Sequence, residues 1–305
     1  MKTYRLERVS GTFYKSSAKE LDNQIKNCFL NNEFGPKNEP LVKKTDEFMA
    51  FICPHAGYDM SGPCAAHAYR LVGENKTPDV VVIIGPNHNS IGIGAALFPE
   101  GVWATPIGEV EVDSEFNKLI EAEDKDFIED ELSHSLEHSI EVQVPFLKYV
   151  FGDSCPKIVP ICINASTNDI KTIKELGDAI FKAWEKSGKN VLFIASSDFS
   201  HVGPSYGFTL SDEKGEELNK DIKVLDWKAV KEIQELHVDA LFSYTDKENL
   251  TICGLNAIGV LMQVLKNMKA KKLKGKLLKQ YTSGDVTGDY VNFVDYCAIQ
   301  FSEEK

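Results

Sequence analysis

Runs of apolar residues alternate with stretches of helical periodicity along most of the chain. Four mostly apolar runs predict strands, and they lie at 48–53, 79–84, 157–163 and 191–196. The first, second and fourth are expected to be buried, and the run at 191–196 is typical of a strand buried on both faces of a sheet. Elsewhere apolar residues recur every three or four positions, which predicts helices at 17–32, 62–72, 113–121, 140–151, 168–186, 212–223, 227–236, 239–244 and 253–268. Shorter strands are predicted as a pair at 95–98 and 102–105, and as a second pair at 277–282 and 291–301.

This order of elements predicts an α/β fold. Strands that alternate with helices give a largely parallel central sheet that helices cover on both faces. The last two strands are joined by Ser283, Gly284 and Asp285, so we expect them to pair antiparallel. No internal repeat, low-complexity segment or linker divides the sequence, and we therefore expect a single domain over residues 1–305.

Polar side chains follow three of the predicted buried strands at the point where each strand ends. His55 follows the first strand, His88 follows the second, and Asp198 with His201 follows the strand at 191–196. Open α/β sheets hold their ligands in a crevice at the carboxyl ends of the strands. We therefore expect these side chains to share one crevice.

Two imidazoles and one anionic ligand form the facial arrangement that leaves coordination positions open on iron or a similar ion. His55 and His88 are therefore candidate metal ligands. Cys253 stands just before an apolar helix, where a thiolate is electrostatically favoured, although a free cysteine also serves as a small buried apolar residue. From the residues alone the third ligand stays open among Cys253, Asp198, Glu137 and Glu141.

The segment 134–141, with the sequence HSLEHSIE, carries two histidines four positions apart. It does not match the HExxH zinc motif, because its glutamate comes directly before the second histidine. We expect a polar loop that leads into a helix N-terminus and either lines the pocket or hydrogen-bonds a ligand histidine. His67 is expected to be packed within a helix, and His237 to lie at the surface.

Composition excludes several classes of partner. The formal charge of −12 over 305 residues provides no positive stripe for nucleic acid. No window is apolar for long enough to span a membrane. Seven cysteines without a CxxC pair indicate reduced thiols and a cytoplasmic location. Nucleotide-binding glycine motifs and the GxSxG motif of hydrolases are also absent from the sequence.

Five motifs stand in order along the chain: PHAGY at 54–58, GPNH at 85–88, EHSIE at 137–141, SSDFSH at 196–201 and TICG at 251–254. Together they resemble the Memo family, over nearly the whole length. The fold of that family is similar to that of class III extradiol dioxygenases, which hold non-haem Fe(II). The resemblance implies that His55, His88 and Cys253 ligate a metal and that His201 is the acid–base histidine, with Asp198 beside it. Around this pocket we expect Tyr58, Asn87, Glu137, His138 and Glu141.

The resemblance implies Fe(II) as the cofactor, with copper or zinc as alternatives because a thiolate replaces the glutamate ligand of the dioxygenases. The first functional hypothesis is a metal-dependent oxidoreductase that acts on a small molecule or peptide. The second is a non-catalytic binding or signalling module that captures a peptide or partner protein in the same pocket, and the third is a zinc hydrolase. Prokaryotic members of the family are linked with AMMECR-type and radical-SAM proteins, which makes these expected partners.

Overall fold

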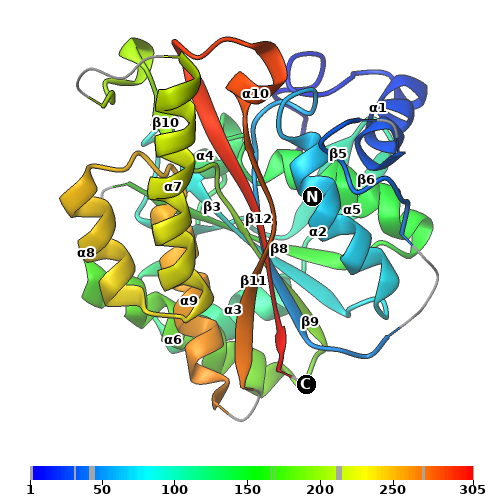
Figure 1. Cartoon of the computed structure of the whole chain (residues 1–305). Coiled ribbons are helices and arrows are strands. Elements are labelled where there is room, and N and C mark those ends of the chain that lie inside the picture. The colour runs from blue at the N-terminus through cyan, green and yellow to red at the C-terminus, as the bar shows by residue number, and fades with distance from the viewer. Residues whose placement is uncertain are drawn as a thin grey trace.

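The computed structural model describes residues 3–30, 32–40, 45–165, 167, 169–210, 215–269 and 272–304. Within these residues, nine strands form one large sheet in the order β10-β12-β2-β9-β3-β8-β4-β7, with β11 beside β12 (Figure 1). The four middle strands are β2 (Met49–Cys53), β9 (Val191–Ser196), β3 (Val80–Asn87) and β8 (Lys157–Asn164). They are the four predicted apolar runs, and they lie parallel to one another.

The large sheet as a whole is mixed, and the expectation of a largely parallel sheet was wrong. On one side, β12 (Phe293–Glu303) runs antiparallel to β2, to β11 (Leu273–Thr282) and to β10 (His201–Val202). The pairing of β11 with β12 is the antiparallel arrangement that the sequence predicted. On the other side, β4 (Ala95–Leu97) runs antiparallel to β8 and parallel to β7 (Phe127–Glu129). The connection from β3 into β4 is too short for a helical crossover, so β4 cannot continue the parallel order. On the other side, β12 is the reversed strand, and β10 keeps the direction of β2 and β9.

A second sheet of the described residues contains three strands in the order β1-β5-β6. These are β1 (Thr3–Arg5), β5 (Gly101–Thr105) and β6 (Gly108–Glu111). The predicted pairing of 95–98 with 102–105 was therefore wrong, because β4 belongs to the large sheet and β5 to the small one. β4 pairs instead with the distant β7 and β8, and β5 pairs with the distant β1 and with the adjacent β6.

Helices cover both faces of the large sheet. Val80, Val82 and Ile84 of β3 pack into one apolar cluster, whereas Val81 and Ile83 pack into another, as the alternation of side chains along a strand requires. The first cluster contains residues of α3 (Ser114–Glu123), α6 (Ile170–Ser187), α7 (Gly215–Gln234), α8 (Val238–Glu248) and α9 (Leu255–Asn267). The second contains residues of α1 (Ala18–Leu30), α2 (Gly62–Glu74) and α5 (Val144–Phe151).

The remaining helices are short: α4 (Glu131–Ser135), α10 (Ser283–Thr287), and the 3₁₀ turns η1 (Glu141–Gln143), η2 (Gly152–Ser154) and η3 (Pro204–Tyr206). The two helices predicted at 212–223 and 227–236 are one continuous helix, α7. The predicted starts at residues 212 and 168 lie outside the described residues. Pro145 stands in the first turn of α5, where its missing N–H is tolerated, as the sequence predicted.

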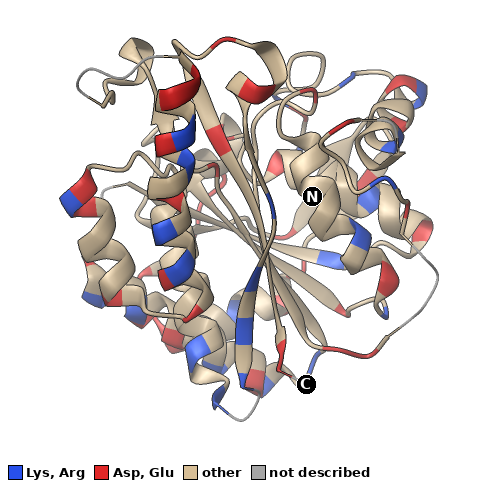
Figure 2. Cartoon of the chain, in the orientation of Figure 1, with Lys and Arg blue, Asp and Glu red and all other residues tan. Residues whose placement is uncertain are grey.

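Charged residues stand mainly in the helices and in β11, whereas the middle strands are almost free of them (Figure 2). This distribution is expected for strands that helices cover on both faces. Among the described residues, no helix combines the length and the apolar character needed to cross a bilayer.

Candidate metal centre

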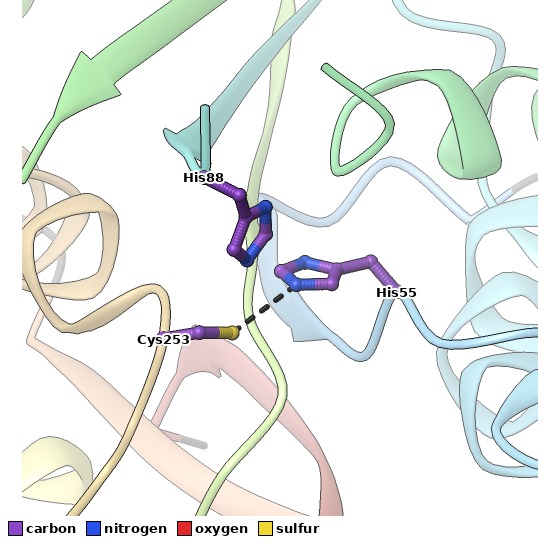
Figure 3. Close-up of side chains that lie close together, drawn as sticks. All are labelled: His55, His88 and Cys253. Atoms are coloured by element: carbon purple, nitrogen blue, oxygen red, sulfur yellow. Dashed lines mark hydrogen bonds between the residues drawn. The ribbon is translucent and has the colours of Figure 1, made fainter. Parts of the chain in front are cut away.

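Three side chains from distant parts of the chain converge at the carboxyl ends of the middle strands. His55 follows β2 by two residues, His88 directly follows β3, and Cys253 directly precedes the turn into α9. One ligand atom from each lies within 4.8 Å of the others, and the Cys253 Sγ is 3.1 Å from the His55 Nε2. Figure 3 shows the three side chains pointing toward one another.

The segment of residues 251–254, called the Cys253 segment below, reaches this position through close packing of backbone atoms. Ile252 forms a bridge with Ser200, and the Gly254 N–H donates to the Ser197 hydroxyl at 3.0 Å. A Cβ atom on residue 254 would lie 2.6 Å from the carbonyl oxygen of Ser196. Glycine at this position therefore allows Cys253 to approach the end of β9.

Both imidazole rings are held through their Nδ1 atoms. The His55 Nδ1 lies 3.1 Å from the Ser196 hydroxyl, and the His88 Nδ1 lies 2.9 Å from a carboxylate oxygen of Glu137. Fixing one ring nitrogen in this way sets the tautomer and direction of the other. Nε2 is therefore the nitrogen that each ring can offer to a metal.

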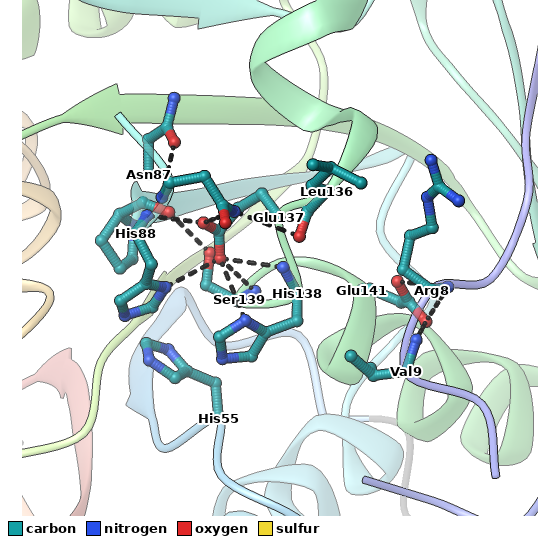
Figure 4. Close-up of polar contacts among 12 residues, drawn as sticks. Arg8, Val9, His55, Asn87, His88, Leu136, Glu137, His138, Ser139 and Glu141 are labelled. Carbon is teal, nitrogen blue, oxygen red and sulfur yellow. Dashed lines mark hydrogen bonds and ion pairs between the residues drawn. The ribbon is translucent and has the colours of Figure 1, made fainter. Parts of the chain in front are cut away.

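Glu137 is a buried anion that organises this side of the centre (Figure 4). Besides the His88 ring, it accepts the backbone N–H groups of His88 at 2.6 Å, His138 at 2.9 Å and Ser139 at 2.8 Å. Burial alone would raise the pKa of Glu137, but the hydrogen bond and charge of His88 outweigh burial and lower this pKa to about 2. Glu137 is therefore ionised at neutral pH.

The two ring environments differ in their electrostatics. Burial, with the neighbouring His88, His138 and His201, holds the pKa of His55 well below its usual range. Burial also acts to lower the pKa of His88, but the hydrogen bond and charge of Glu137 outweigh it and raise that pKa. At neutral pH His55 is thus neutral, which is the form that ligates metals.

Cys253 lies in surroundings that disfavour a free thiolate. Burial and then the charge of Asp198 raise the pKa of its thiol well above the usual value. The helix N-terminus behind it acts in the opposite direction, because it favours the thiolate, as the sequence suggested. A bound cation would supply the missing positive charge. The set of two imidazole nitrogens and one thiolate fits a transition metal that accepts mixed nitrogen and sulfur ligands.

His201 and Asp198 lie next to this cluster. The Asp198 Oδ1 does not hydrogen-bond to His201. That oxygen accepts the backbone N–H of His55 at 2.8 Å, and burial raises the Asp198 pKa to about 6. The His201 ring packs edge-on against Tyr206, and burial lowers its pKa to about 4. Among the described residues, no group hydrogen-bonds the buried Nε2 of His201.

The polar groups of the other expected pocket residues mostly form hydrogen bonds within the protein. The Tyr58 hydroxyl donates to the Val142 carbonyl, and the Asn87 amide donates to the Ile91 carbonyl. His138 stacks on His88, with 4.8 Å between ring centroids, and burial lowers its pKa to about 4. A second possible ligand group, formed by His88, Glu137 and His138, shares these same side chains.

Glu141 binds the N-terminal segment instead of the His55–His88–Cys253 cluster. Its carboxylate accepts the backbone N–H groups of Arg8 and Val9 (Figure 4). It also accepts the Tyr14 hydroxyl and forms an ion pair with Arg5. The Arg5 guanidinium also donates to the carbonyl groups of His134 and Glu137. Sequence reasoning missed Arg5, because nothing in its local pattern marks it.

Three histidines lie away from the centre. The His134 ring faces the Ala96 carbonyl and is fully buried, although its sequence neighbour His138 faces the centre. His67 lies on α2 and its Nε2 is 2.9 Å from the Phe34 carbonyl oxygen, in agreement with a hydrogen-bonded helix residue. The His237 side chain is 60% exposed, at the surface as predicted.

Replacing Glu137 by alanine is expected to weaken metal binding by about 10–100-fold, because the His88 ring loses the group that orients it. The matched control is Glu129→Ala, which changes an exposed glutamate and should leave the metal affinity unchanged.

Glu137 should also contribute to the pH dependence of stability. Since the pKa of folded Glu137 lies below its ordinary value of 4.5, its ionised form stabilises the fold above pH 4.5, and this contribution is lost as the pH falls toward 2. The free energy of unfolding in urea, measured between pH 3 and pH 6, should therefore depend less steeply on pH for Glu137→Ala than for the wild type. If both this pH dependence and the metal affinity were unchanged, Glu137 would not be the ionised group that orients the His88 ring.

Comparison with known proteins finds similar sequences over nearly the whole chain. The family model for Memo-like proteins matches residues 5–300. A MEMO1 family protein of Methanopyrus kandleri is 37% identical over 298 residues, which covers 97% of this chain and 98% of the relative. Another, of Saccharolobus solfataricus, is 40% identical over 303 residues, with 97% and 99% covered. The crystal structure of an uncharacterized protein from Escherichia coli K12 has a TM-score of 0.48 and 12% identity, and covers 83% of this chain and 98% of that one.

Proposed function

This chain belongs to the Memo family, and we propose that it binds one transition-metal ion through His55, His88 and Cys253 and uses it in oxidation chemistry. The observation that carries the proposal is the convergence of these three ligand atoms within 4.8 Å from positions far apart in the sequence. Apolar packing alone gives no reason for two oriented imidazoles and a thiol to face one another. We propose Fe(II) as the preferred ion, with copper and zinc as alternatives.

The ligand set supports this choice by its chemistry. Two histidines and one anionic ligand that leave coordination positions open are typical of non-haem Fe(II) oxygenases, which couple substrate oxidation to O₂. The thiolate also suits Cu(I) and Zn(II), so the ligands alone do not select iron. The likeness of the five sequence motifs to those of a family with a dioxygenase-like fold favours iron, and it favours a small-molecule or peptide substrate.

Two further side chains would handle protons beside the metal. His201, with a pKa lowered to about 4 by burial, is neutral at pH 7 and its Nε2 is unpaired among the described residues, so it can accept a proton there. Asp198, whose pKa burial raises to about 6, can hold or release a proton near neutrality while its Oδ1 keeps the His55 backbone in place. Phe13 packs edge-on against the His138 ring on this side of the centre.

The direct test is the metal content of protein purified without oxygen, followed by titration with Fe(II), Cu(I) and Zn(II). We expect about one ion per chain, with two histidines and one sulfur in its X-ray absorption spectrum. Oxygen uptake with catechols, thiols and ascorbate then tests the oxidation chemistry. Protein that contains no metal and takes up none of the three ions would overturn the proposal and leave the pocket as a peptide-binding or partner-binding surface. A zinc-loaded protein with esterase activity would replace oxidation by hydrolysis.

A further inference from the structure

Two buried carboxyl groups lie behind the segment that carries His201, and neither belongs to the metal centre. Asp226 stands on α7 and Asp295 on β12, and both are fully buried. Buried carboxyl groups are costly unless they are paired and hydrogen-bonded. Their contacts therefore identify what they stabilise.

Asp226 holds Ser200 through both of the donors that this residue has. Its Oδ2 accepts the Ser200 backbone N–H at 3.0 Å, and its Oδ1 accepts the Ser200 hydroxyl at 2.7 Å. Asp295 holds the same segment through its backbone, donating to the Ser200 carbonyl at 3.0 Å and accepting from the Phe199 N–H at 2.9 Å. Ser200 is thus bonded at its N–H, its hydroxyl and its carbonyl.

Residues 199–202, called the Ser200 segment below, in turn hold the Cys253 segment in place. Ser200 forms an antiparallel bridge with Ile252. The Thr251 hydroxyl accepts the His201 N–H at 2.9 Å and donates to the His201 carbonyl at 2.7 Å. A displacement of Ser200 would therefore move His201 and Cys253 together.

The pair of acids lacks one hydrogen-bond donor. Gln280 donates to the Asp295 Oδ2 at 2.6 Å, but the buried Asp295 Oδ1 receives no hydrogen bond from any described residue. The two carboxyl groups lie next to each other, and burial raises the pKa of both. A single proton shared between them would supply the missing donor, as in other carboxyl pairs that cannot both ionise.

Other titratable groups around the pair leave it without a direct counter-charge. The Lys223 ammonium lies close, but it donates to Asp285. Burial raises the pKa of the nearby thiols and phenol, so these groups are neutral at pH 7. They are Cys64 on α2, Tyr244 on α8 and Cys297 on β12.

We propose that Asp226 and Asp295 are positioning residues that share one proton and clamp the Ser200 segment, which fixes the register of His201 against Cys253. The part that concerns Cys253 as a ligand rests on the proposed function, whereas the clamp itself does not. As the pH rises and the shared proton is lost, two adjacent negative charges repel each other and the clamp loosens.

Four variants separate the clamp from general stability. Asp226→Ala removes both acceptors from Ser200, and Ser200→Ala removes only the hydroxyl donor. Asp295→Asn replaces the shared proton by a permanent amide donor, so it should keep the clamp closed at every pH. Asp285→Ala is the matched control, because it breaks another polar contact to α7, through Asn219 and Lys223, without contacting Ser200.

The experiment is amide hydrogen exchange of the metal-free protein over residues 199–202 and 251–254, from pH 6 to pH 9, followed by Co(II) titration of the same variants. Asp226→Ala should lose protection at both segments by at least about tenfold, Ser200→Ala by less, and Asp285→Ala by none. Wild-type protection, corrected for intrinsic exchange, should fall as pH rises, and the Asp295→Asn profile should be flat. Co(II) affinity should fall in the same order as protection.

Equal protection in Asp226→Ala and Asp285→Ala would overturn the clamp, and so would a pH profile of Asp295→Asn that matches the wild type. Should Asp226→Ala fail to fold, the contrast between Ser200→Ala, Asp295→Asn and the control decides the question. If the wild type binds no Co(II), the proposed function fails, yet the exchange profiles still decide whether the clamp exists.

Discussion

Replacing Cys253 by serine is expected to lower the affinity for Fe(II) or Co(II) by more than ~100-fold, since loss of outer residues that only orient a ligand already reduces affinity by about 10–100-fold. The thiolate is the one anion among the three proposed ligands, and its Sγ lies 3.1 Å from the His55 Nε2. Serine keeps the size of the side chain but does not ionise at neutral pH. The sulfur-to-metal charge-transfer absorption of the Co(II) protein should disappear together with the affinity.

Cys155→Ser is the matched control for this change. Cys155 is also a free, partly exposed cysteine with a thiol pKa raised by burial, to about 12, but it lies at the end of the 3₁₀ turn η2 and not in the centre. Its replacement should leave metal affinity and the absorption spectrum unchanged. If Cys253→Ser bound metal as tightly as Cys155→Ser, sulfur would not be a ligand and the third ligand would have to be sought among the carboxylates.

Replacing Arg5 by alanine is expected to destabilise the fold by about 3–5 kcal/mol, because removing one partner of a buried ion pair leaves an uncompensated charge. The side chains of Arg5 and Glu141 are only 4% and 1% exposed. The guanidinium also bonds the carbonyl groups of His134 and Glu137 and packs over the Trp103 ring. Urea unfolding at pH 7 measures the loss directly.

The control for Arg5 is Lys171→Ala, which removes an exposed ion pair between Lys171 and Glu175 on α6. Exposed pairs of this kind contribute about 0.3–0.5 kcal/mol. Because the Arg5 contacts hold the loop that carries Glu137, Arg5→Ala should also weaken metal binding, which Lys171→Ala should not. A loss of stability in Arg5→Ala as small as that in the control would show that Glu141 is satisfied by its other donors alone.

The centre of the sheet could be predicted from the sequence because its signals are local. The runs that became β2, β3, β8 and β9 are apolar at nearly every position, and buried strands need such runs. The polar residues after three of them marked the edge where the candidate site lies. The residues alone left the third ligand open, and the family resemblance pointed to Cys253, which the structure brings beside His55.

The supporting contacts could not be predicted because each joins residues with no shared local pattern. Arg5 lies in a three-residue strand and bonds groups more than 120 positions away. Asp226 resembles any polar residue on a surface helix, yet it is fully buried against Ser200. The mixed direction of the outer strands depends on the same kind of distant pairing, which hydrophobic periodicity does not encode.

The pairing of β12 with β2 also has a consequence for the order of events during translation. Until residues 293–303 leave the ribosome, the fully apolar β2 has an unpaired edge in the nascent chain, and such edges promote aggregation. Cys253 likewise emerges long after His55 and His88. A growing chain therefore presents the two histidines before the cysteine, and the three proposed ligands can come together only after Cys253 has emerged. If the chain binds a metal as proposed, loading would therefore follow the emergence of Cys253 from the ribosome.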